Sequence, residues 1–101
     1  MKAYLITPEN QSIELVEVSS LNDIKSIIGF DTLESDEIDK NGDRLFFDEE
    51  CFLRGTSGRF QIDKIIPVSG KGVVVGVKDD EVTLSDVVTG IDDLRRRVKF
   101  L

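Results

Sequence analysis

Apolar and polar residues alternate at the start of the chain, and this alternation predicts an N-terminal β-hairpin. Residues 2–7 alternate between two faces, the PENQ turn signal occupies residues 8–11, and the alternation resumes over 13–18. Side chains on a strand point to opposite faces with a period of two. Leu5 and Leu15 are therefore predicted to lie in the core.

Four apolar residues then recur at helical spacing, and they predict a short helix over 21–28. Ser19 or Ser20 is the expected N-cap, and Gly29 is the expected glycine that ends the helix. Hydroxyl side chains satisfy free N–H groups at a helix start, and glycine adopts the left-handed conformation that closes a helix. The apolar residues of this helix are Leu21, Ile24, Ile27 and Ile28.

Two further patterns predict the middle of a sheet. Residues 30–38 and 44–47 flank an Asn-Gly pair at positions 41 and 42, which is the strongest short signal for a hairpin because both residues tolerate positive φ. A short strand is expected over 60–62. Residues 73–77 have no polar phase, as is typical of a strand buried on both faces.

The C-terminal region predicts a second helix over 85–98, because its apolar residues are spaced four, three, four and three apart. These residues are Val87, Ile91, Leu94, Val98 and Leu101. Gly90 disfavours a helix interior by roughly 1 kcal/mol, so a start near Gly90 is the alternative.

The predicted fold is a single α+β domain over residues 1–101, with a mostly antiparallel or mixed sheet of five to six strands and two helices. A chain of 101 residues, 40% of them hydrophobic, is long enough to bury one core. The residues expected in that core are Leu5, Leu15, Ile24, Ile28, Leu45, Phe47, Phe60, Val74 and Leu94.

Composition narrows the functional classes. The net charge of -7 disfavours direct binding to nucleic acid and to anionic membranes, and it favours basic protein partners. The chain has no histidine, the commonest acid–base catalyst at neutral pH, so we expect no enzyme and no cofactor. Cys51 is the only cysteine and residues 1–10 lack a signal-peptide pattern, which together indicate a cytoplasmic protein.

The order of these elements resembles a family of short bacterial proteins of unknown function that phages and plasmids carry. The matching stretches are MKAYLITPENQSIELVEV, the helix that ends in IIGFDT, the hairpin IDKNGDRLFFDEE, and SGKGVVVGVKDD before a terminal helix. This resemblance implies a compact α+β fold and an origin on a mobile element. It implies no activity and no functional residues.

Carboxylates crowd around the second hairpin, and they predict a binding surface. Between residues 31 and 50 the chain carries nine of them, against Lys40 and Arg44. The residues expected to contact a partner are Glu34, Asp36, Glu37, Asp39, Asp43, Asp48, Glu49 and Glu50. Alternate strand residues lie ~6.8 Å apart on one face, as expected for Glu34 with Asp36 and for Glu37 with Asp39. Such spacing can imitate a phosphate backbone. The leading hypothesis is therefore a non-catalytic binding or regulatory protein that uses this acidic face. Its most specific form is an inhibitor that engages a basic, nucleic-acid-binding host protein.

Two alternatives stay open from the sequence. The first is a small-ligand or metal-binding regulatory domain. Arg54, Arg59 and Lys64 surround the glycine-containing loop 55–58, whose backbone amides could bind an anion. The second hairpin only partly fits the pattern of a calcium-binding loop, so no metal site is predicted. The second is a structural protein. In that case the N-terminal hairpin or the 73–77 strand would complete a sheet across a homodimer.

Overall fold

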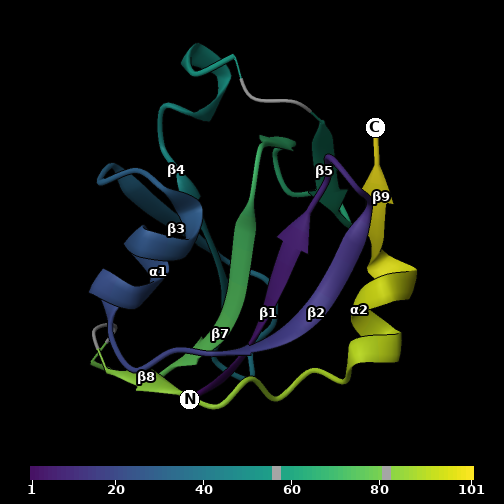
Figure 1. Ribbon diagram of the computed structural model, residues 1–101. Coiled ribbons are helices and arrows are strands. Elements are labelled where there is room, and N and C mark those ends of the chain that lie inside the picture. The colour runs from purple at the N-terminus through teal and green to yellow at the C-terminus, as the bar shows by residue number, and fades with distance from the viewer. Residues whose placement is uncertain (56–57, 81–82) are drawn as a thin grey trace.

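The N-terminal hairpin forms as predicted. The computed structural model describes residues 1–55, 58–80 and 83–101, and in it β1 (Lys2–Thr7) pairs antiparallel with β2 (Ser12–Glu17) (Figure 1). The prediction that Leu15 is in the core is wrong, because its side chain is 57% exposed. Leu15 lies opposite the buried Tyr4 but one strand further out, at the edge of the sheet.

The first helix has the predicted bounds and caps. α1 (Leu21–Ile28) begins after Ser20, whose hydroxyl accepts the N–H of Asp23 at 3.3 Å. It ends at Gly29, which adopts a φ of 91° and donates its N–H to the carbonyl of Lys25. The apolar spacing directs Ile24 and Ile28 into the core.

The second hairpin is confirmed, with a turn that differs from the one expected. β3 (Leu33–Glu37) pairs antiparallel with β4 (Asp43–Asp48). Only Gly42 of the Asn-Gly pair has positive φ. The Asn41 side chain instead accepts the N–H of Asp43 at 3.0 Å, which organises the turn without left-handed backbone at Asn41.

The valine-rich strand lies at the centre of the main sheet. β7 (Gly72–Val77) is buried at every residue and pairs with β1 on one side and β4 on the other. The strand order is β2-β1-β7-β4-β3, and β8 (Leu84–Ser85) adds to β7. Because both sides of β7 are paired within the chain, the prediction that this strand could pair across a homodimer is wrong. β2 and β3 form the two outer edges.

A second, three-stranded sheet was not expected. β5 (Arg59–Ile62), the predicted 60–62 strand, lies between β6 (Val68–Ser69) and β9 (Val98–Phe100), and all pairings are antiparallel. A 3-10 turn, η1 (Cys51–Leu53), precedes this sheet.

The C-terminal helix is shorter than the 85–98 prediction. α2 (Ile91–Arg97) begins after Gly90, so the alternative start is confirmed. The preceding residues bond to the large sheet in place of forming a helix. Ser85 pairs with Gly76, and the N–H of Val87 donates to the carbonyl of Lys2 at 2.9 Å. Residues 86–90, which we call the strap, thus run along one end of the sheet.

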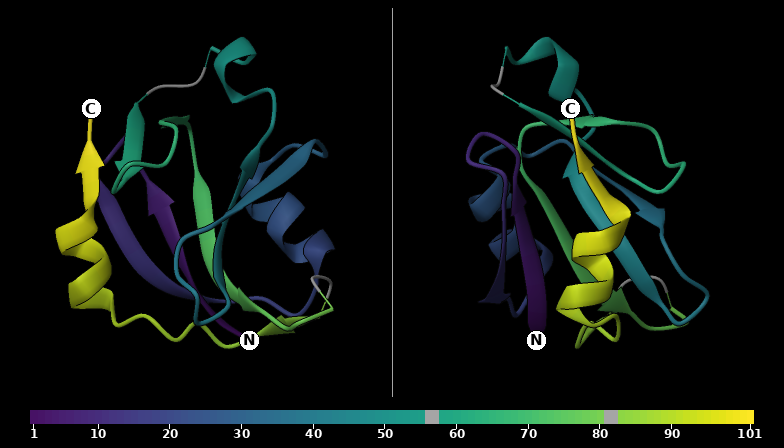
Figure 2. Two further views of the ribbon diagram at one scale, coloured as in Figure 1. Left: turned by 180° about the vertical axis from the view of Figure 1, so that it is seen from behind. Right: turned by 90° about the vertical axis from the view of Figure 1, so that its right-hand side faces the viewer.

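Two apolar layers cover the two faces of the large sheet. The small sheet and α2 pack on one face around Phe60, Leu45 and Leu94, and α1 packs on the other around Val73 and Val75. Figure 2 shows α1 and α2 at opposite sides of the molecule. The α+β prediction is confirmed, as are the core positions Ile24, Ile28, Leu45, Phe60, Val74 and Leu94. Leu5 and Phe47 are only half-buried against these layers. No helix in the described ranges is long and apolar enough to cross a membrane.

Candidate functional site

Asp43, predicted to contact a partner, is instead buried and holds the strap in place. Its carboxylate is fully inaccessible, and it accepts the N–H groups of Val88 at 3.0 Å and Thr89 at 2.8 Å. It also accepts the Thr89 hydroxyl at 2.6 Å. Hydrogen bonds from these donors offset the unfavourable free energy of burying a carboxylate. Asp43 is therefore a fold residue and is unavailable to a partner.

Asp39 is likewise occupied, by an arginine from α2. Arg97 donates from Nη1 to Asp39 at 2.8 Å, from Nη2 to Asp63 at 2.6 Å, and to the carbonyl of Ile38 at 3.1 Å. The Arg97 hydrogen bond lowers the pKa of Asp39, and the Thr89 hydroxyl adds to this against an opposing effect of burial. β3 ends at Glu37, so the predicted strand pair of Glu37 with Asp39 does not form.

Asp48 lies at the other end of β4, in a second polar network. Thr32 and Arg54 donate side-chain hydrogen bonds to it, and Glu50 donates its N–H at 3.1 Å. Burial raises the pKa of Asp48, but these donors together outweigh burial, so the pKa lies below its usual value. The Arg54 guanidinium also stacks 4.4 Å from the centre of the Phe30 ring. Asp48 is thus a fold residue that joins η1 to the hairpin.

These networks predict how stability depends on pH. The pKa values of Asp39, Asp48 and the Ser19-bonded Asp23 are all lowered by folding. Each carboxylate then contributes stability that is complete above the unfolded-state pKa of about 3.9 and is lost as the pH falls below it. Urea unfolding should give a constant free energy between pH 5 and 7 and a decline below about pH 4. Asp48→Asn should flatten that decline, and an unchanged slope would contradict the assignment.

Six carboxylates of the 31–50 segment remain at the surface around β3. We call them the acidic surface, and they are Asp31, Glu34, Asp36, Glu37, Glu49 and Glu50. Glu50 is partly neutralised by Arg54 at 3.4 Å. Of the two cations in the segment, Arg44 directs its guanidinium to Ser35. The surface therefore retains an excess of negative charge along the outer strand of the large sheet.

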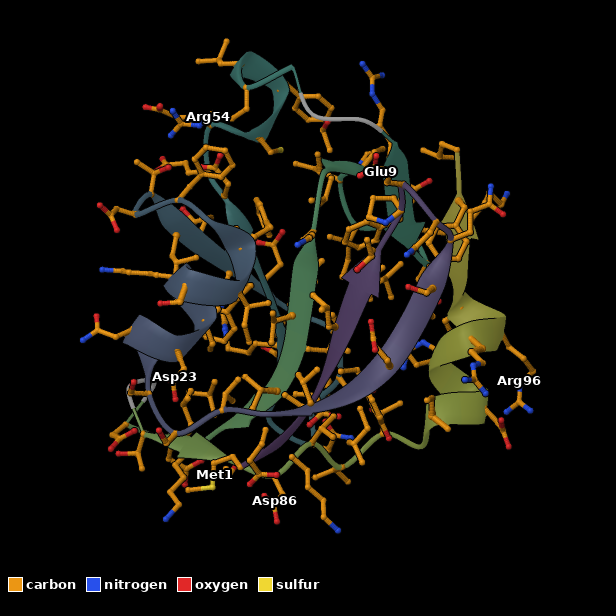
Figure 3. All side chains as sticks on the ribbon, in the orientation of Figure 1. Met1, Glu9, Asp23, Arg54, Asp86 and Arg96 are labelled. Atoms are coloured by element: carbon orange, nitrogen blue, oxygen red, sulfur yellow. The ribbon has the colours of Figure 1, made fainter. Side chains whose placement is uncertain are left out.

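The predicted anion-binding residues have separate surroundings. Arg54 is ion-paired with Asp48 at 2.9 Å, beside η1 at the top of Figure 3. Arg59 stacks on the Phe52 ring at 5.3 Å, and Lys64 follows the far end of β5. Residues 56 and 57 of the loop lie outside the described residues. Arg54 already has carboxylate partners, Asp48 and Glu50, and these raise its pKa.

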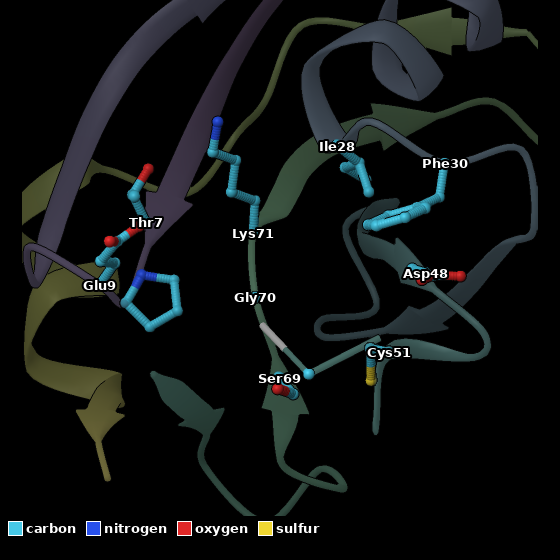
Figure 4. Close-up of a pocket in the computed structure, with 11 residues that line it drawn as sticks. Thr7, Glu9, Ile28, Phe30, Asp48, Cys51, Ser69, Gly70 and Lys71 are labelled. Atoms are coloured by element: carbon cyan, nitrogen blue, oxygen red, sulfur yellow. The ribbon is translucent and has the colours of Figure 1, made fainter. Parts of the chain in front are cut away.

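A cavity of about 310 Å³ lies between segments that are distant in the sequence (Figure 4). Ile28, at the end of α1, and Phe30, just after it, form one wall, and Cys51 contributes its buried thiol. Lys71 and Glu9 line the opposite side, from the loops at the ends of β6 and β1. No spacing signal in the sequence links these residues, because they come from four separate turns. Among the described residues no group of three or more acidic or thiol side chains is arranged to hold a metal ion.

No protein-family model, curated protein or solved structure matches this chain. The resemblance to a phage- and plasmid-carried family therefore stays a prediction.

Proposed function

We propose that this protein is a non-catalytic binding module that works in the cytoplasm and engages a basic surface of another protein through the acidic surface. The observation that carries the proposal is the division of the hairpin carboxylates. Asp39, Asp43 and Asp48 bind donors within the protein and so hold the fold. The other six carboxylates, which form the acidic surface, remain exposed or half-exposed. Exposed like charges attract a partner of opposite charge and steer its approach.

A nucleic-acid-binding protein is the partner class that this surface suits best. Such proteins present Lys and Arg side chains spaced to meet phosphates. Glu34 and Asp36 lie at alternate positions of β3 and share one face, which supports charge mimicry over that part of the strand. An inhibitor carried by a mobile element remains the biological setting we propose.

The test is a pull-down from nuclease-treated bacterial lysate, with a matched pair of charge variants. The test bait carries Glu34→Gln, Glu37→Gln and Glu49→Gln. The control bait carries three changes of equal charge at exposed positions elsewhere, which are Glu9→Gln, Asp79→Asn and Asp92→Asn. A nucleic-acid-handling protein captured by the native and control baits, released by salt and lost from the test bait, would support the proposal. Equal capture by all three baits would reject it.

The cavity favours small-ligand binding as a second candidate function. Its apolar wall of Ile28 and Phe30 suits an apolar ligand, and Lys71 supplies one positive charge beside the carboxylate of Glu9. Anilinonaphthalenesulfonate should then fluoresce on binding to the folded protein, and Lys71→Gln should weaken the binding. An absence of fluorescence under native conditions would leave the acidic surface as the working site.

A further inference from the structure

The two outer edges of the large sheet differ in how their backbone groups are satisfied. At the β3 edge, Arg44 donates from Nη2 to the carbonyl of Ser35 at 3.1 Å and from Nε to its hydroxyl at 3.0 Å. The Ser35 N–H donates to the Glu34 carboxylate at 3.0 Å. Side chains therefore occupy the middle of this edge, which is a common way to prevent the addition of another strand.

Among the described residues, no side chain is bonded to the outward-facing backbone groups of β2 in this way. Met1 and Val18 exchange both main-chain hydrogen bonds, so the directly hydrogen-bonded pairs of the hairpin are those of odd-numbered β1 residues, among them Leu5 with Glu14. The alternation then turns the N–H and C=O groups of Ile13, Leu15 and Glu17 away from β1. No strand of the described chain pairs with this side (Figure 1).

The backbone of β1 supports this assignment independently. The Lys2 N–H donates to Asp86 at 2.8 Å and its carbonyl accepts the N–H of Val87, so Lys2 faces away from β2. Lys2 is paired in register with Glu17, and in such a pair neither residue bonds to the other. Glu17 must therefore also face away from β1, toward solvent.

The side chains of β2 define the chemistry of what would fit there. Leu15 is an exposed apolar residue at the middle of the strand, and Glu14 and Glu17 are exposed carboxylates on opposite faces. Glu17 also forms an ion pair with the Met1 amino group at 3.1 Å, and its side chain is still 79% exposed. β2 contains no Lys or Arg. A complementary strand would place an apolar side chain beside Leu15 and cations beside the two glutamates.

We propose that the outer edge of β2 binds an extended, basic segment of another protein as an additional strand of the large sheet. Strand addition of this kind gains affinity from main-chain hydrogen bonds and specificity from alternate side chains. The site goes beyond the acidic surface, because it uses none of the β3 carboxylates. A second copy of this chain fits less well, since each copy carries a charge of -7 and two copies paired around Leu15 would bring their Glu14 side chains diagonally close.

The probe is a synthetic peptide, acetyl-Thr-Lys-Thr-Val-Lys-Val-Thr-amide, which places valine opposite Leu15 and lysines opposite Glu14 and Glu17 in an antiparallel pairing. Nuclear magnetic resonance should show slower hydrogen exchange on binding at the amides of Ile13, Leu15 and Glu17. Glu14 and Val16 already bond to β1 and should change little. A peptide N-methylated at the residues that face β2 should bind roughly tenfold more weakly or worse, since it loses two or more hydrogen bonds.

Two protein variants and one control complete the test. Glu14→Gln should weaken peptide binding about two- to fivefold. Leu15→Pro should abolish it while keeping the fold, because the N–H that proline lacks points to solvent, and circular dichroism verifies the fold. Glu34→Gln, at the protected edge, should leave binding unchanged and so separates this site from the acidic surface. The proposal would be overturned if the N-methylated peptide bound as tightly as the unmodified one, or if amides outside β2 became protected from exchange. A concentration-dependent dimer that Leu15→Pro removes would also overturn it.

Discussion

Asp43→Ala should destabilise the protein by about 3–5 kcal/mol, because several buried donors lose the charged acceptor that they share. The carboxylate is fully buried, and its loss leaves the N–H groups of Val88 and Thr89 and the Thr89 hydroxyl without an acceptor. Each unsatisfied buried donor costs about 1–3 kcal/mol, and solvent entering beside the strap reduces the total. Urea unfolding monitored by circular dichroism measures the change.

The control for Asp43→Ala is Glu37→Ala, on the neighbouring strand of the same hairpin. Glu37 is exposed, so its replacement should alter the free energy of unfolding by less than about 0.5 kcal/mol. Asp43→Asn should fall between the two, because the amide retains one acceptor but turns an NH₂ group toward N–H donors. If Asp43→Ala cost no more than Glu37→Ala, the strap would not depend on this carboxylate.

Phe60→Ala should cost about 3–5 kcal/mol, because it removes the largest fully buried side chain of the core. The ring lies between the two sheets, directly over Gly72. A Cβ added at Gly72 would meet Cζ of Phe60 at 2.6 Å and Cδ1 of Leu45 at 2.9 Å. Phe52, which is 52% exposed, provides the matched control, and Phe52→Ala should cost less than about 1 kcal/mol.

The same contact predicts coupling between Phe60 and Gly72. Gly72→Ala alone overfills the space and should cost about 1–3 kcal/mol. Combined with Phe60→Leu, part of that cost should disappear, because the shorter side chain no longer reaches the added methyl group. A double-mutant cycle in urea measures the interaction energy. Strictly additive changes would mean that the ring does not pack on Gly72 in solution.

The local patterns of the chain predicted those elements whose stability is decided within a few residues. α1 has the expected bounds because the Ser20 cap, the apolar spacing and Gly29 all act within one short segment. The N-terminal hairpin and the buried β7 strand follow for the same reason. The first residues of the predicted 85–98 helix do not form a helix, because they bond to β7 and β1 instead. Their partner in β1 is Lys2, which lies more than eighty residues earlier in the chain.

The carboxylates of the second hairpin likewise could be predicted only in part from the sequence. Composition predicted a carboxylate-rich segment, but Asp43 and Glu37 look alike in a sequence. The difference between them depends on Thr89, which is 46 residues from Asp43 along the chain.

The sequence by itself determined the α+β class, the first helix, both hairpins and the negative charge, because short-range sterics, period and charge require no distant partner. Only the tertiary structure decided which carboxylates hold the fold and which stay at the surface, and that one edge of the sheet is protected while the other is open. Those properties depend on which distant donors and strands come into contact, and that contact is settled by packing of the whole chain.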